Sequence, residues 1–179
     1  MSGQPRFSVD AARRELAAAQ EALSWALPLI SDEDAHAART PSDWSAATNL
    51  AHLVIYEERI AVPVLLAATH ARDGAADVRS GDEGWLVHDA EALGREPFLG
   101  IIGRYRAIVA RHADLLASFD DDTFNRPICS LWQAAPAYSG GRSVPAGWIA
   151  KKSAQHTWEH GHALLRAGWR TYGKAEVVG

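Results

Sequence analysis

The sequence predicts an all-α protein, a four-helix bundle with long connecting loops. Three observations support this. Long segments rich in Ala, Leu, Glu and Arg repeat apolar residues at helical spacing. Gly-, Pro- and Asp-rich segments separate the later helices, and no segment shows a strand pattern of convincing length. Helices with one apolar face must bury it, and four of them with one or two long connections form a bundle.

The first helix is predicted over residues 8–30, with Pro28 ending or kinking it in its last turn. Its apolar stripe consists of Leu16, Leu23, Leu27 and Ile30. Residues 31–39 are predicted to add a short turn, because Ser31 can cap a helix whose first residues are acidic. Residues 40–43 are predicted to form a loop.

The second helix is predicted over residues 44–70, with a kink at Pro63. Leu53, Tyr56 and Ile60 mark its buried face, and His52 lies beside them on that face. Residues 71–84 are polar and rich in Gly and Asp, which predicts a loop.

The third helix is predicted over residues 89–119, although Gly94 and Pro97 interrupt its early part. Residues 120–141 have no helical period and predict a long ordered loop, in which Trp132 and Tyr138 are candidates to line a substrate pocket. The fourth helix is predicted to start near Ser143, with Pro145 in its first turn, and to end near Trp169. The apolar tail after Gly173 is predicted to be frayed.

Length and composition narrow the class of protein. The 179 residues suit a single domain over 1–179, and the net charge of −4 with scattered Lys and Arg argues against a nucleic-acid binder. The single cysteine, Cys129, excludes an internal disulfide. No secretory signal and no run of membrane-spanning length is visible. We therefore expect a soluble cytoplasmic protein without a membrane partner, and a homodimer stays open.

The fourth helix carries the strongest chemical signal, His156 and His160, which are four residues apart. Residues at this spacing lie on one helix face, so both imidazoles can bind one metal ion. His162 lies on another face and is not expected to join them. Since His52 lies on the buried face of the second helix, the bundle can bring it to the pair. The proposal from the residues is a three-histidine metal site.

Three neutral imidazoles suit Zn²⁺ best and are also compatible with Ni²⁺ or Fe²⁺. Three protein ligands leave a coordination position open for water or substrate. Each ligating histidine needs an acceptor for its second ring nitrogen, and Glu57, Glu159 and Gln155 are the candidates. The competing interpretation is that the histidines are ordinary core residues.

The stretch Trp44–Leu53 has the sequence Trp-Ser-Ala-Ala-Thr-Asn-Leu-Ala-His-Leu. It resembles the W-S-x-x-x-x-L-x-H-L start of the second helix in the DinB/YfiT-like superfamily. The histidine of that helix and the H-x-x-x-H of the fourth occur in the family's order, and the similarity covers roughly residues 10–169. The resemblance implies a DinB-type bundle with a divalent metal held by His52, His156 and His160.

Members of this family with an assigned activity are thiol-dependent, which implies a low-molecular-weight thiol, mycothiol or bacillithiol, as cofactor. The leading interpretation is a metal-dependent thiol S-transferase or isomerase acting on an electrophilic small molecule. Mycothiol-dependent isomerases commonly carry a second domain that has no counterpart here, which weakens the isomerase interpretation. The alternatives are a non-catalytic metal-binding stress-response bundle and a metal-assisted hydrolase.

Overall fold

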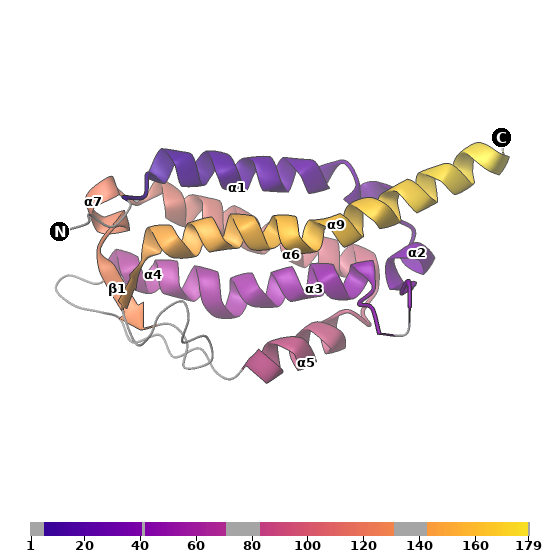
Figure 1. The fold of residues 1–179 in the computed structure, drawn as a ribbon, viewed down its shortest axis with the longest axis horizontal. Helices are drawn as coiled ribbons and strands as arrows, with labels where there is room; N and C mark the ends of the chain where they lie inside the picture. The colour runs from indigo at the N-terminus through magenta and orange to yellow at the C-terminus, as the bar shows by residue number, and fades with distance from the viewer. Residues whose placement is uncertain (1–5, 41, 71–82, 131–142, 179) are drawn as a thin grey trace.

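The computed structural model describes residues 6–40, 42–70, 83–130 and 143–178. In this part of the chain, four long helical stretches run side by side (Figure 1). They are α1 (Val9–Ser24), α3 (Ala46–Tyr56) continued by α4 (Val62–His70), α6 (Phe98–Ala117) and α9 (Ala146–Val178). α1 packs against α6 and α9, and α3 packs against the same two helices. The predicted all-α four-helix bundle is confirmed.

The first helix ends earlier than predicted. α1 begins after Ser8, whose side chain accepts a hydrogen bond from the N–H of Ala11, and it ends at Ser24. Residues Leu27–Leu29 form a separate 3₁₀ turn around Pro28, with tighter i→i−3 hydrogen bonds on either side of it. α2 (Asp32–His36) follows, and the Ser31 hydroxyl caps it as predicted by accepting from the N–H of Asp34 at 3.1 Å.

The second helical stretch covers the predicted range, but its irregularity differs from a simple proline kink. The hydroxyl of Ser45 caps α3 by accepting from the N–H of Thr48 at 3.1 Å. Between α3 and α4 lies a π-helical segment, Glu57–Ala61, in which the N–H of Val62 bonds the carbonyl of Glu57. Pro63 follows immediately and cannot donate to a regular α-helical ladder. Such π-helical turns occur frequently at functional sites.

The predicted third helix is two helices, so that prediction was wrong. α5 (Glu83–Leu93) starts inside the segment that was predicted as a loop, and α6 begins only at Phe98. Gly94 and Pro97 separate the two, and the carboxylate of Asp32 accepts from the N–H of Phe98 at 2.8 Å. Gly94 is required by packing, since a Cβ there would lie 2.8 Å from the Cα of Thr48 at the start of α3.

The sequence showed no strand pattern of convincing length, and the structure adds one short ladder to the helices. After α7 (Asp121–Phe124), β1 (Pro127–Ser130) pairs antiparallel with β2 (Ser143–Pro145). Among the described residues, three pairs form this ladder, too few to leave an alternating pattern in the sequence. Pro145 therefore belongs to β2 rather than to the first turn of α9. Trp132 and Tyr138 lie outside the described residues.

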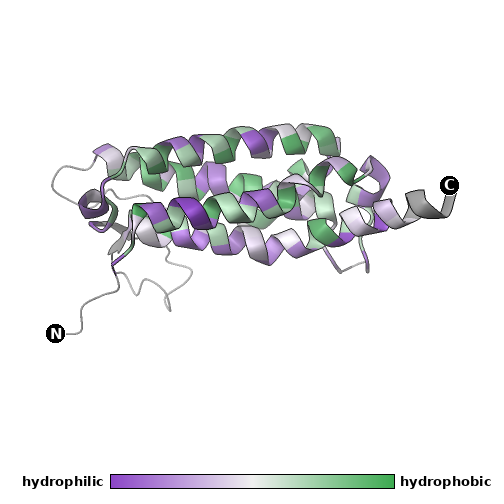
Figure 2. Cartoon of the chain, turned by 90° about the horizontal axis from the view of Figure 1, so that it is seen from above, coloured by the Kyte–Doolittle hydropathy of each residue, from purple (hydrophilic) through white to green (hydrophobic). Residues whose placement is uncertain are grey.

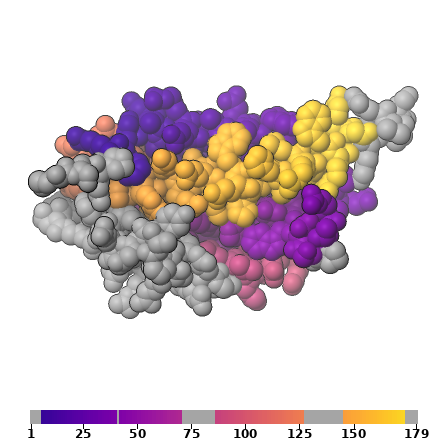
Figure 3. Space-filling model, viewed as in Figure 1, coloured from indigo at the N-terminus to yellow at the C-terminus, as the bar shows by residue number. Residues whose placement is uncertain are grey.

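The last helix is longer than predicted, because α9 continues through Gly173 to Val178. Its C-terminal part projects beyond the other helices, and one side of it faces outward between α1 and the segment before α3 (Figures 1 and 3). Along the helices, hydrophobic and hydrophilic residues are interleaved (Figure 2). The largest fully buried side chains include Leu23 of α1, Leu50 of α3, and Ile101 and Leu116 of α6. No described helix is both long and apolar enough to cross a membrane.

Candidate metal centre

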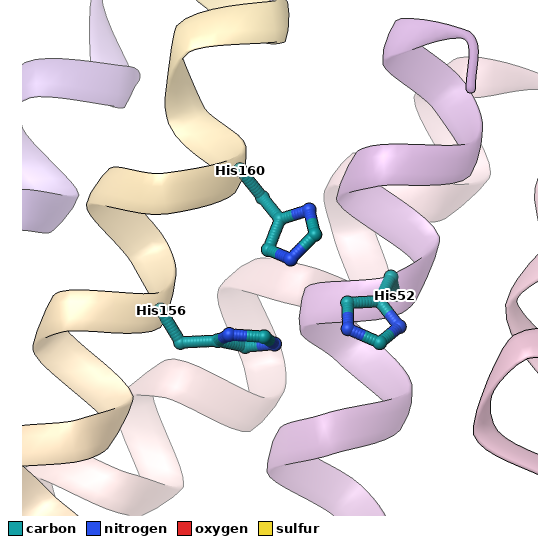
Figure 4. Close-up of side chains that lie close together, drawn as sticks. All are labelled: His52, His156 and His160. Carbon is teal, nitrogen blue, oxygen red and sulfur yellow. The ribbon is translucent and has the colours of Figure 1, made fainter. Parts of the chain in front are cut away.

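Three histidines from two helices meet inside the bundle, and these are the three that the sequence singled out. His52 projects from α3, and His156 and His160 project from successive turns of α9 (Figure 4). One ring nitrogen from each lies within 4.8 Å of the other two. The ring centroids are 4.5 to 4.9 Å apart. Three nitrogen donors at this separation could hold one metal ion.

Burial keeps these imidazoles neutral at pH 7. Desolvation, reinforced by the neighbouring histidines, lowers the pKa of His52 to about 3. Desolvation, together with His160 and Lys152, likewise lowers the pKa of His156 to about 3. Burial also lowers the pKa of His160, although Glu159 acts in the opposite direction. Neutral imidazole is the form that binds a metal, so the cluster offers lone pairs instead of repelling a cation.

The hydrogen bonds of Asn49 fix the proton on His160. The amide nitrogen of Asn49 donates to the carbonyls of Ser45 at 2.8 Å and Trp44 at 3.3 Å. The amide oxygen must therefore be the atom that lies 2.8 Å from Nδ1 of His160, so that Nδ1–H donates to it. Nε2 of His160 is then left as the ring nitrogen with a free lone pair.

His156 and His52 each have one ring nitrogen without a hydrogen-bond partner among the residues that the structure describes. Nδ1 of His156 lies 3.3 Å from a carboxylate oxygen of Glu159, one of the three predicted acceptors. Within the described residues, Nε2 of His156 and Nδ1 of His52 are buried and have no hydrogen-bond partner. A buried polar atom without a partner costs about 1–3 kcal/mol. A bound ion would remove that cost, and the residues present therefore fit a metal.

Aromatic rings flank the three histidines. The Trp44 ring lies 5.0 Å from the His52 ring and stacks on His160 at 6.1 Å. The Tyr56 ring lies 4.6 Å from the His156 ring. Burial and the nearby carboxylates raise the pKa of Tyr56, so its hydroxyl stays protonated at neutral pH. Contact with these rings helps to hold the imidazoles in place.

Glu57 and Gln155 do not take the role that the sequence suggested. Glu57 is buried, and its carboxylate accepts from Nδ1 of His112 at 2.7 Å and from the hydroxyl of Ser153. Both of its oxygens therefore serve a separate buried network. Gln155 is exposed and makes no hydrogen bond to the three histidines within the described part of the chain. His162 is exposed and lies outside the group of three.

Sequence reasoning missed Asn49, Trp44 and His112. Asn49 could have been found, because it lies three residues before His52 and a polar side chain with poor helix propensity is unusual on a buried face. Trp44 was noted only as part of a motif. His112 gave no signal, since its partner Glu57 is distant in sequence and only the folded bundle brings the two together.

Comparison with known proteins gives one family and two solved structures. A family model described as the DinB superfamily matches residues 15–164. No curated protein matches the chain. The structure of a mycothiol-dependent maleylpyruvate isomerase superposes with a TM-score of 0.70 at 13% identity, covering 88% of this chain and 61% of that one. The chain thus spans less than two thirds of that protein's length.

The second structure is YfiT from Bacillus subtilis, described as a probable metal-dependent hydrolase with an unusual four-helix bundle topology. It superposes with a TM-score of 0.63 at 15% identity and covers 96% of this chain and 94% of that one. At these identities, the two likenesses establish the fold alone.

Proposed function

The chain belongs to the DinB superfamily, and we propose that it is a metal-dependent member of that family whose ion is held by His52, His156 and His160. The observation that carries the proposal is the approach of three ring nitrogens to within 4.8 Å of one another. The neutral state of the imidazoles supports it, and so do the two buried nitrogens that have no partner in the described part of the chain. Zinc fits three imidazoles best, and nickel or iron is compatible with the same donors.

When bound, a divalent ion with an open coordination position supplies Lewis acidity, which lowers the pKa of a thiol and polarises a carbonyl. The chain's own residues prepare the site for it. Asn49 and Glu159 hold the protons on Nδ1 of His160 and His156, which leaves the opposite nitrogens free. Contact with Trp44 and Tyr56 helps to hold the imidazoles in place.

We infer that the reaction uses a low-molecular-weight thiol such as mycothiol or bacillithiol for S-transfer or isomerisation of an electrophile. Two things support this. A thiol is a soft ligand that suits zinc, and thiolate is the reactive form that Lewis acidity favours. The fold is also shared with a mycothiol-dependent enzyme.

A metal-assisted hydrolase is the second candidate. The observation that favours it is the extent of the likeness to YfiT, which covers nearly the whole of both chains. A hydrolase would use the same histidines with water as the nucleophile.

One assay distinguishes the thiol-dependent enzyme from the hydrolase. Zinc-loaded protein is mixed with mycothiol, bacillithiol or glutathione and with monochlorobimane, and conjugation is followed by fluorescence. We expect conjugation above the spontaneous rate with at least one thiol, and loss of that excess in His52→Ala. Hydrolysis of a panel of esters and amides without any thiol conjugation would reject S-transfer and favour the hydrolase.

A further inference from the structure

A cavity of about 620 Å³ lies beside the histidine cluster. Its walls are the segment before α3, the start of α3, and the second half of α9, which lie side by side in Figure 3. Its size is within the range of small-molecule sites, roughly 300–1,000 Å³. Trp44, Asn49 and Glu159 line this cavity, and each also contacts at least one of the three histidines. The cavity and the cluster therefore share a wall.

Arginine side chains give the cavity a positive charge. Arg39, Arg166 and Arg170 line it, together with the acids Asp43 and Glu159. The acids already have partners. Asp43 lies 3.6 Å from Arg39, and Glu159 lies 3.3 Å from both Lys152 and His156.

Arg166 is the cavity arginine whose guanidinium is available to a ligand. It has no ion pair or hydrogen bond with any residue that the structure describes. Four residues on, Arg170 contacts the carbonyl of Asp34 at 3.5 Å. The spacing from Glu159 through Ala163 and Arg166 to Arg170 puts these side chains on one stripe of α9, next to the stripe that carries the histidines. An anion that enters the cavity would meet Arg166 a short distance along α9 from the cluster.

The remaining walls select among anions. A guanidinium pairs with a carboxylate through two parallel hydrogen bonds. Trp44 and Trp169 also line the cavity, and an aromatic ring there can stack on a planar ligand. A carboxylate attached to a planar group can use the guanidinium and an aromatic wall together, whereas inorganic phosphate has no planar face to stack. We propose that this cavity binds a small planar carboxylate, with Arg166 as its pairing residue, and so supplies the anionic substrate that reacts at the neighbouring metal centre.

Only the link to reaction rests on the proposed function, so binding is tested separately. The probe is benzoate, and its uncharged match is benzamide. Titration is followed by isothermal calorimetry and by tryptophan fluorescence, since two tryptophans line the cavity. We expect benzoate to bind and benzamide to bind at least about tenfold more weakly, as loss of one charge-assisted pair predicts. Arg166→Gln should weaken benzoate binding by a similar factor, and Arg166→Lys should restore part of it.

Arg106→Gln, which removes an exposed arginine of α6 outside the cavity, is the matched control and should bind benzoate as the wild type does. Equal affinity for benzoate and benzamide, equal loss in both arginine variants, or tighter binding of inorganic phosphate would overturn the proposal. His52→Ala should retain benzoate binding. If it does while thiol conjugation is absent from the wild type, the proposed function fails and the carboxylate site stands. If conjugation is present and benzoate inhibits the wild type and Arg166→Gln equally, the carboxylate site fails alone.

Discussion

The amide oxygen of Asn49 accepts a hydrogen bond from Nδ1 of His160 at 2.8 Å, across the contact between α3 and α9. Because the amide nitrogen of Asn49 is occupied by two carbonyls of its own helix start, this oxygen cannot be exchanged for a donor. Asn49 thus determines which nitrogen of His160 is free to bind a metal, and it does so from the helix that carries His52.

Replacement of Asn49 by alanine should therefore weaken metal binding without removing a ligand. Outer hydrogen-bond partners of metal-ligating histidines typically contribute about 10–100-fold in affinity. We expect Asn49→Ala to lose its zinc at a chelator concentration about 10–100-fold lower than the wild type requires. Gln155→Ala, which alters an exposed residue of α9, is the control and should behave as the wild type. Equal zinc affinity in the two variants would show that Asn49 has no orienting role.

The buried network around Glu57 predicts that loss of this carboxylate destabilises the fold more than loss of its neighbour Glu58. Glu57→Ala leaves His112 and Ser153 buried without their acceptor, which should lower the free energy of unfolding by about 3 kcal/mol or more. Its neighbour Glu58 instead pairs with the exposed Arg104, so Glu58→Ala should cost at most about 1 kcal/mol. Urea unfolding of the metal-free proteins measures both. Similar losses in the two variants would contradict the structural role of Glu57.

The lowered pKa values of His52 and His156 predict how the metal-free protein responds to acid. Between pH 6.5 and about 3, the unfolded chain binds protons at these histidines and the folded chain does not. Stability should therefore fall as the pH drops through this window, by up to about 1.4 kcal/mol per pH unit for each histidine. Above pH 6.5 the two histidines do not contribute to the dependence of the unfolding free energy on pH.

Unfolding free energies at pH 7.5, 6.0 and 5.0 check this prediction. The double variant His52→Gln, His156→Gln should lose less stability on acidification than the wild type, because glutamine does not titrate. Other titrating groups are common to both proteins and cancel in the difference. Parallel pH profiles would mean that the two imidazoles are not held neutral by the fold.

Helical periodicity was enough to predict the bundle and to bring His52, His156 and His160 together, because i,i+4 spacing and a buried stripe constrain side-chain direction strongly. The cap at Ser31 followed from local chemistry. The α5–α6 break was visible only as Gly94 and Pro97, and the β1–β2 ladder is too short to show a period.

Contacts between segments that are distant in the chain could not be predicted from the sequence. Glu57 was predicted to serve a ligating histidine because it is near His52 in sequence, but the π-helical turn that begins at Glu57 lies against His112 and Ser153. The cavity with Arg166 is likewise formed by residues of α9 and of the segment before α3, which are far apart in the chain. Such juxtapositions depend on how the helices pack, which a one-dimensional pattern does not specify.

The metal content of the purified protein tests the central claim most directly. Elemental analysis of the wild type should find one divalent ion per chain, and added Zn²⁺ should raise the melting temperature of the metal-free form, since ligand binding stabilises the folded state. His52→Ala and His160→Ala should retain no ion, whereas His162→Ala, at an exposed position, should retain it fully. Absence of a stoichiometric ion together with an unchanged melting temperature, or equal loss in all three variants, would contradict the three-histidine site.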